Sequence, residues 1–146
     1  MNKLYTIGFT KKKAEDFFEI LKSNNIEKII DIRLNNTSQL AGFSKYPDIE
    51  FFLNEILNVK YSHDSFLSPL ESTLKKYKKK QISWDSYVQE FNDTMEERKI
   101  NEYILNKYSS DDNICLLCSE ASPVNCHRSI VSKIFREVFD CEIIDL

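Results

Sequence analysis

The segment from Cys118 to Arg128 gathers several side chains that can do chemistry: two thiols, a carboxylate, an imidazole and a guanidinium. Cys126, His127 and Arg128 fall in the opening turn of a predicted helix, where free backbone N–H groups and the helix dipole favour negative charge. A thiol there can have a lowered pKa and react as a thiolate, and Arg128 can bind a phosphate or carboxylate through two hydrogen bonds. The alternative for Cys126 is a small buried residue on the apolar face of that helix.

A second charged pair, Asp31 and Arg33, ends the short apolar run from Ile26 to Ile32. Side chains alternate along a strand, so the two face the same side. They can orient each other, bind an anion or transfer protons. The alternative is a structural ion pair that holds the following loop, residues 33–47.

The spacing Cys115-x-x-Cys118 suggests zinc, with Cys126, His127 and His63 as further ligands. Zinc knuckles place such a pair on a turn, whereas positions three apart in a strand point to opposite faces. A redox pair of Cys115 and Cys118 fails for the same reason. We therefore expect no metal and no other cofactor.

Strand patterns alternate with helix patterns along the chain. The apolar runs predict strands over residues 4–7, 26–32, 59–63, 114–118 and 142–144. The helical spacing of apolar residues predicts helices at 48–57, 70–80 and 84–108, with one helix after a Thr10 cap and a last helix after an Asn125 cap. In the helix over 48–57 we expect Phe51, Phe52, Ile56 and Leu57 to face inward.

This order predicts one α/β domain over residues 1–146. The expected architecture is Rossmann-like: three layers, with a mostly parallel sheet flanked by helices and the apolar run 114–118 at its centre. Ligands in such folds bind beyond the carboxyl ends of the strands. The residues expected to converge there are those just after each strand, namely Gly8, Thr10, Asp31, Arg33, His63, Asp64 and the segment from Cys118 through Glu120 to Arg128.

The composition is that of an ordinary globular protein, with 42% hydrophobic and 29% charged residues among 146. No apolar run approaches the roughly 20 residues that span a bilayer, the beginning of the chain lacks a signal-peptide pattern, and the four cysteines do not resemble a secreted disulfide framework. We therefore expect a cytoplasmic protein without membrane contact. The sequence leaves the oligomeric state open.

The net charge of −3 gives no global footprint for nucleic acid. Two runs are nevertheless basic. Lysines 11–13 are expected in the first turn of the first helix, where their positive charges oppose the helix dipole. An anionic ligand near Gly8 would offset these charges. Lysines in the stretch 75–80, with Tyr77, could contact phosphates, although a solvated helix face explains them as well.

Together these segments resemble one family, the domain of unknown function 488 (DUF488) family, over nearly the whole chain. The resemblance rests on these residues: Thr6-Ile-Gly8, Asp31-Ile-Arg33, the loop from Leu34 to Phe43, Trp84-x-x-Tyr87, and Leu117-Cys118-x-Glu120-x-x-Pro123-x-x-Cys126-His127-Arg128. It implies a compact α/β fold with the shared polar residues in one cleft, and it brings no established reaction. Phe9 departs from the family, where a His or Tyr often follows the first glycine.

Two functions from different classes fit these residues. The first is an enzyme in which Cys126 is the nucleophile, Glu120 and Asp31 are acid–base or orienting groups, and His63 is an alternative to His127 as the base. In that enzyme Arg33, Arg128, His127, Cys118, Gly8 and Thr10 would bind an anionic, phosphate- or nucleotide-containing small molecule. The second is a non-catalytic module for a nucleotide or nucleic acid. The thiol favours the enzyme, since a phosphate binder does not need it.

Overall fold

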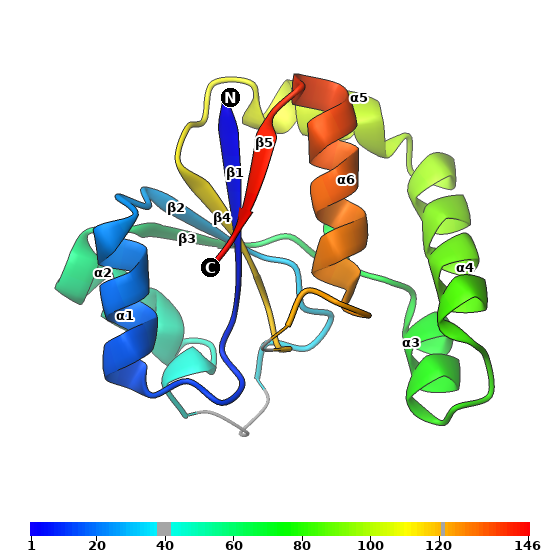
Figure 1. The fold of residues 1–146 in the computed structure, drawn as a ribbon, viewed down its shortest axis with the longest axis horizontal. Coiled ribbons are helices and arrows are strands. Elements are labelled where there is room, and N and C mark those ends of the chain that lie inside the picture. Colours follow the sequence, from blue (N-terminus) through cyan, green and yellow to red (C-terminus); the bar gives the residue numbers. More distant parts are fainter. Residues whose placement is uncertain (38–41, 121) are drawn as a thin grey trace.

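The computed structural model describes residues 1–37, 42–120 and 122–146. Five strands form a parallel sheet in the order β3-β2-β4-β1-β5 (Figure 1). Their bounds are β1 Lys3–Gly8, β2 Lys28–Asp31, β3 Lys60–His63, β4 Ile114–Cys118 and β5 Glu142–Asp145. The apolar run 114–118 is the central strand, as its composition predicts.

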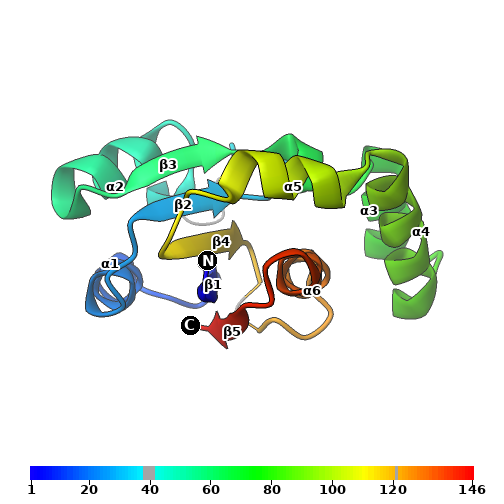
Figure 2. The same cartoon turned by 90° about the horizontal axis from the view of Figure 1, so that it is seen from above.

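Helices cover both faces of the sheet, which confirms the predicted three-layer α/β architecture (Figure 2). Helices α1 and α2 pack on one face, and α4, α5 and α6 pack on the other, with α3 beside α4. Their bounds are α1 Ala14–Ser23, α2 Asp48–Leu57, α3 Glu71–Lys78, α4 Trp84–Glu97, α5 Ile100–Tyr108 and α6 His127–Phe139. None of the described helices is both long and apolar enough to cross a membrane.

The central strand β4 serves both hydrophobic cores, because its side chains alternate between the faces of the sheet. Ile114 and Leu116 pack with the core under α4, α5 and α6, whereas Cys115 and Leu117 pack with the core under α1 and α2. Cys115 and Cys118 therefore lie on opposite faces, as strand geometry requires. This excludes a zinc knuckle built on that pair.

The helix predicted over residues 84–108 is wrong in one respect, because the chain breaks it into α4 and α5. Lys99 adopts a left-handed backbone conformation with φ of 51°, which ends one helix and redirects the next. Ile100 and Ile104 then face the core, at 4% and 0% exposure. Apolar spacing continues across the break, so the sequence pattern alone does not reveal it.

The inward face predicted for α2 is wrong for two of its four residues, whereas Phe52 and Leu57 do pack against the core. Phe51 and Ile56 are 62% and 57% exposed, while Ile49 and Leu53 are fully buried. The helix carries two adjacent apolar stripes, and within each stripe the residues recur four positions apart, so both satisfy the helical period. Packing of α2 onto β3 and α1 buries the stripe of Ile49 and Leu53. Only the tertiary structure decides between the two stripes.

Asp64, directly after β3, ties the edge of the sheet to α5. Its buried carboxylate accepts hydrogen bonds from the hydroxyls of Tyr103 (2.9 Å) and Tyr108 and from Lys107 Nζ (3.0 Å). Burial by itself opposes ionisation, but these hydrogen bonds, led by the one from Tyr108, outweigh it and lower the pKa of Asp64.

This carboxylate predicts a loss of stability in acid. Because the folded pKa lies below the unfolded value of about 3.9, its contribution to the free energy of unfolding is full above that value and disappears as pH falls through the folded pKa. We expect Asp64→Asn to cost about 2–4 kcal/mol at neutral pH, and the difference from wild type to shrink below pH of about 4. Urea denaturation at several pH values measures it; a constant difference would contradict this account.

Candidate functional site

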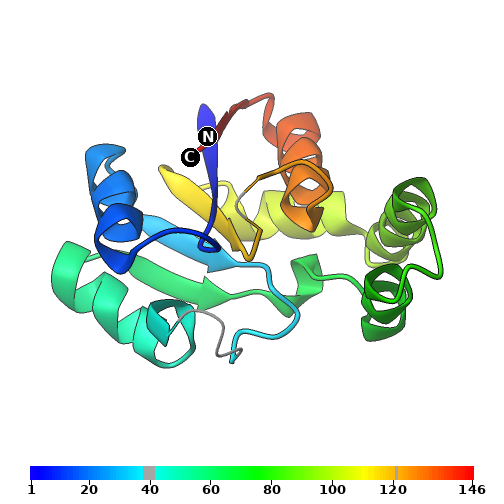
Figure 3. The ribbon, with the colours of Figure 1, turned by 60° about the horizontal axis from the view of Figure 1, so that its bottom comes forward.

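The carboxyl ends of three neighbouring strands bring the predicted site residues to one edge of the sheet. β1 ends at Gly8, β2 at Asp31 and β4 at Cys118, and the parallel register pairs Gly8 with Cys118. His63 ends β3 opposite Asp31. Figure 3 shows the chain leaving β1, β2 and β4 in the same region, beside the loop that leads from β4 into α6.

Asp31 and Arg33 form a buried, two-point ion pair. Arg33 Nε donates to Asp31 Oδ1 at 2.9 Å and Arg33 Nη2 donates to Oδ2 at 2.7 Å, and the side chains of Asp31 and Arg33 are only 0% and 2% exposed. Arg33 Nη2 also donates to the carbonyl of Ser44 at 2.7 Å, which fixes the far end of the loop after β2. The hydrogen bonds and charge of Asp31 raise the pKa of Arg33 despite its burial.

Tyr61 and Asn36 complete this pair, and sequence reasoning missed both. The Tyr61 hydroxyl donates to Asp31 Oδ2 at 2.6 Å, and Asn36 Nδ2 donates to that hydroxyl at 3.1 Å. Burial and the negative Asp31 raise the pKa of Tyr61, so it stays protonated as a donor. Asp31 thus accepts four hydrogen bonds, counting the Arg33 backbone N–H. These bonds suit an orienting carboxylate better than a proton-transfer group.

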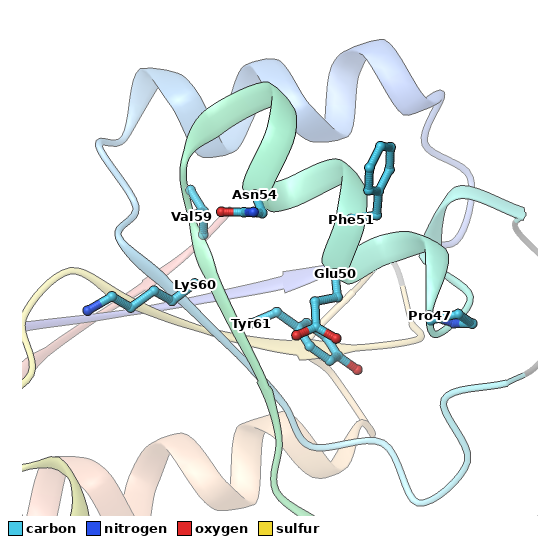
Figure 4. A pocket seen from close by; sticks show the side chains of 7 residues that line it. All are labelled: Pro47, Glu50, Phe51, Asn54, Val59, Lys60 and Tyr61. Carbon is cyan, nitrogen blue, oxygen red and sulfur yellow. The ribbon is translucent and has the colours of Figure 1, made fainter.

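Tyr61 also borders a surface pocket of about 570 Å³ between α2 and β3 (Figure 4). Glu50 and Lys60 also line this pocket, and the Lys60 side chain points away from Tyr61. The thiols do not line this pocket. The contact of Tyr61 with Asp31 could have been predicted only from the register of β3 against β2. That register is a long-range pairing, which the sequence pattern does not give.

The two thiols of the Cys118–Arg128 segment meet. Cys118 Sγ lies 2.9 Å from Cys126 Sγ, and the two residues are 2% and 3% exposed. Cys118 comes from the end of β4, while Cys126 is the residue before the first turn of α6. The loop between them therefore folds the two ends of the segment together.

Cys118 is the thiol whose surroundings favour ionisation. Burial opposes its charge, but the hydrogen bond from Cys126, the backbone N–H groups of Ser119 and Glu120 and the positive Arg128 together lower its pKa. These donors lie at the start of the loop that follows the central strand. A thiolate there is held by fixed dipoles instead of by solvent.

Cys126 has the opposite character, so the lowered pKa predicted for it is wrong. Its hydrogen bond to Cys118 and its burial raise the pKa of Cys126. The 2.9 Å contact by itself allows either sulfur to be the donor, and these pKa directions favour Cys126 as the protonated partner. The helix start alone would favour a thiolate at Cys126, but the neighbouring thiolate outweighs it.

His127 is a neutral neighbour of the thiols. Its Nε2 donates to the carbonyl of Ile32 at 2.9 Å, and burial lowers the pKa of the imidazole. Cys118 Sγ lies 3.4 Å from Nδ1 and 3.6 Å from Nε2. Such similar distances place the sulfur against the ring instead of in line with one nitrogen. His127 therefore packs on Cys118 and links it to the end of β2.

One positive side chain, Arg128, acts on the thiol pair. Arg128 is fully buried and contributes to the lowered pKa of Cys118. Burial and the charge of Arg128 lower the pKa of Lys12, whose other electrostatic neighbour is Cys115 on the opposite face of β4. Lysines 11–13 precede α1, which begins at Ala14; the expectation that they form its first turn is therefore wrong.

Gly8 is required by the close approach of the loop after β4. A Cβ built on Gly8 would collide with the carbonyl of Glu120 and lie 3.0 Å from Arg128 Nη1. Glu120, whose N–H donates to Cys118, therefore has its carbonyl directly against the backbone of β1. A glycine at this position lets the loop close onto the end of the sheet.

Substitution of this glycine tests the contact. We expect Gly8→Ala to lower the free energy of unfolding by about 1–3 kcal/mol and to raise the pKa of Cys118, because the loop must shift. Gly42→Ala is the matched control, since a Cβ there meets nothing within 4 Å. Equal melting temperatures for the two variants would contradict the close contact.

Two predicted helix caps are corrected by the structure. Thr10 does not cap α1, because the residue that precedes this helix is Lys13. The hydroxyl of Thr10 donates instead to the carbonyl of Ser119. Asn125 does not cap α6, because it takes a left-handed conformation with φ of 54° and Cys126 becomes the flanking residue. Both residues serve the β4–α6 loop, a role that depends on contacts distant in sequence.

The remaining predicted residues lie at the rim. The exposed His63 donates through Nε2 to the carbonyl of Arg33 at 2.6 Å. The Glu120 side chain is exposed, although its backbone lies against Gly8. The catalytic roles of His63 and Glu120 stay predictions. Residues 38–41 of the family-like loop lie outside the described residues.

Cys118, Cys126 and His127 could together hold a metal ion, because their ligand atoms all lie within 4.8 Å of one another. Thiolate and imidazole ligands suit zinc. However, two thiolates on one zinc are about 3.8 Å apart, given Zn–S bonds of about 2.3 Å, and here the sulfurs are 2.9 Å apart. The buried charge of Arg128 also opposes a dication. We still expect no stoichiometric metal.

A model of the family described as "Domain of unknown function DUF488" matches residues 13–135 of the 146. The chain belongs to the DUF488 family. Neither a curated protein nor a solved structure matches it. The resemblance seen in the sequence motifs is thus confirmed.

In this DUF488 protein the motif Trp84-x-x-Tyr87 lies beside the thiols. Trp84 stacks on Tyr87 with ring centroids 5.3 Å apart. Tyr87 is 2% exposed, and burial and the nearby Cys118 and Cys126 raise the pKa of its phenol. Phe91, one turn later, stacks on His127 at 6.2 Å. Helix α4 therefore forms an apolar wall over the thiol pair.

Proposed function

We propose that this protein is a cysteine-dependent enzyme that uses the Cys118 thiolate as a nucleophile toward a small anionic substrate. The observation that carries this function is the contact of two buried thiols near a buried arginine: Cys118 Sγ lies 2.9 Å from Cys126 Sγ, and the charge of Arg128 favours ionisation of Cys118. The surroundings of Cys118 lower its pKa, whereas those of Cys126 raise it. A packed core has no need for an ionised sulfur, since a buried charge is costly unless it is compensated.

The positive charge of Arg128 supports an anionic substrate. Arg128 is fully buried, and its charge helps to lower the pKa of Cys118. Cations near a nucleophile attract an anionic group and stabilise the negative charge that develops on it during the reaction. A phosphate ester or a nucleotide is the substrate class that this arrangement favours.

The other residues take supporting roles in this reaction. Asp31 positions Arg33 and the loop after β2, because its oxygens are occupied by Arg33 and Tyr61. Glu120 is the exposed carboxylate nearest in sequence to the nucleophile, and we assign it proton transfer to the leaving group. We assign Cys126 the role of hydrogen-bond donor to the Cys118 thiolate, since its sulfur lies 2.9 Å from that of Cys118.

Small substrates fit the site better than large ones. Cys118 is 2% exposed, and the three pockets of about 470–670 Å³ described on the surface are not lined by the thiols. A bulky polymer does not reach a sulfur at that depth. The substrate is therefore a small molecule or the narrow end of a larger one.

A binding module for a nucleotide or nucleic acid is the second candidate, and the lysines of α3 are the observation for it. Two of them are already paired, Lys75 with Glu71 at 3.0 Å and Lys76 with Glu90 at 2.6 Å. These pairs reduce the positive charge available to a phosphate backbone. The enzyme is thus the better supported of the two.

Turnover and binding measured on the same variants separate the two functions. We expect phosphate and mononucleotides to raise the melting temperature of wild type and of Cys118→Ser, and phosphate-ester turnover to be lost only in Cys118→Ser. The matched control is Cys115→Ser, which changes a buried thiol on the opposite face of β4. Binding without turnover in the wild type would favour the module. Equal turnover in wild type and Cys118→Ser would refute the enzyme.

A further inference from the structure

We infer that Cys118 and Cys126 form a reversible disulfide when the protein meets a peroxide. The sulfurs are 2.9 Å apart in the reduced protein, and a disulfide bond is about 2.05 Å long. They need to approach by less than about 1 Å to bond. This inference shares the Cys118 thiolate with the proposed function and does not depend on its substrate.

The segment that carries Cys126 allows this approach. Cys126 precedes the first turn of α6, and its side chain makes no capping hydrogen bond to that helix. The loop before it lies at the surface, with Val124 73% exposed. Cys118, by contrast, is fixed at the end of the central strand. Cys126 can therefore move toward Cys118 without unmaking α6.

The different ionisation of the two thiols assigns their roles. The Cys118 thiolate attacks one peroxide oxygen; an S–O bond forms, the O–O bond breaks, and the leaving hydroxide takes a proton to become water. Cys118 is then a sulfenic acid. Cys126 loses its proton and attacks that sulfur; the S–S bond forms, the S–O bond breaks, and a second water leaves. The two thiols lose two electrons, and the peroxide gains them.

Burial and charge define what oxidises and reduces this pair. With Cys118 and Cys126 at 2% and 3% exposure, a small oxidant such as hydrogen peroxide reaches the sulfurs most readily. The donors that stabilise the Cys118 thiolate also stabilise the reduced state, and a stabilised reduced state makes a disulfide easy to reduce. A small thiol such as glutathione therefore returns the pair to the dithiol form. While oxidised, the protein lacks its nucleophile.

Mass spectrometry of the folded protein tests the inference. After treatment with one equivalent of hydrogen peroxide and blocking of free thiols, we expect a loss of two hydrogens, a peptide cross-link between Cys118 and Cys126, and full reversal by glutathione. In Cys126→Ser we expect a sulfenic acid on Cys118 that reacts with dimedone. In Cys118→Ser we expect Cys126 to stay reduced.

Cys115→Ser is the matched control and should give the same cross-link as the wild type. Oxidation of wild-type Cys118 directly to sulfinic acid, or oxidation of Cys126 in Cys118→Ser, would overturn the inference. So would one equivalent of zinc bound by the two thiols. A cross-link that forms in a protein without turnover would refute the proposed enzyme alone, and turnover without a cross-link would refute the disulfide alone.

Discussion

Asp31→Ala is expected to lower the free energy of unfolding by about 3–5 kcal/mol, the largest effect on stability at the site. The substitution leaves the guanidinium of Arg33, only 2% exposed, buried without its carboxylate. It also removes the acceptor of the Tyr61 hydroxyl. Urea denaturation followed by circular dichroism measures the loss.

The double variant Asp31→Ala/Arg33→Met should recover most of that loss, because it removes the buried charge together with its partner. We expect a coupling energy of about 1 kcal/mol or more in the full double-mutant cycle. Glu71→Ala, which breaks an exposed pair with Lys75, should stay within about 0.5 kcal/mol of wild type. Strictly additive losses at Asp31 and Arg33 would show that the pair does not interact.

Arg128→Met is expected to have the largest effect on reactivity short of removing Cys118. A positive charge close to a titrating group changes its ionisation by about tenfold or more. Loss of that charge raises the pKa of the Cys118 thiol, so its alkylation by iodoacetamide at neutral pH should slow about tenfold. Rates measured from pH 6 to 10 and assigned by peptide mapping separate this effect from a change in access.

Arg136→Met is the matched control, because Arg136 is exposed on the same helix α6. It should leave the alkylation rate unchanged. Circular dichroism of Arg128→Met and of the control establishes that both variants are folded before their alkylation rates are compared. A pH profile identical to wild type for Arg128→Met would contradict the electrostatic role of Arg128.

The sheet follows from the sequence, because its signals are local. The apolar run 114–118 matches β4, and the predicted edge of converging strands follows from the rule for parallel sheets. Breaks and faces of helices were less predictable. Lys99 turns the chain with no glycine or proline to mark the turn, and only packing selects Ile49 over Phe51 in α2.

The candidate site was predictable in position and not in detail. Ordered motifs place Asp31, Cys118 and Cys126 at one edge, as found. Which thiol ionises depends on the distance between two sulfurs and on donors from Ser119 and Glu120. These contacts come from the path of a loop that has no periodic pattern. The sequence therefore pointed to Cys126, while the geometry favours Cys118.

Carbon NMR of protein labelled at cysteine Cβ tests the central claim most directly, because the signal reports ionisation without requiring access to the sulfur. Signals are assigned with Cys118→Ser and Cys126→Ser. The account predicts that the first thiol proton lost on raising pH belongs to Cys118, below the ordinary value of about 8.5. Cys126 and Cys115 should stay protonated well above that value, since their surroundings raise their pKa. Ionisation of Cys126 before Cys118, or a Cys118 that titrates at or above the ordinary value, would contradict it.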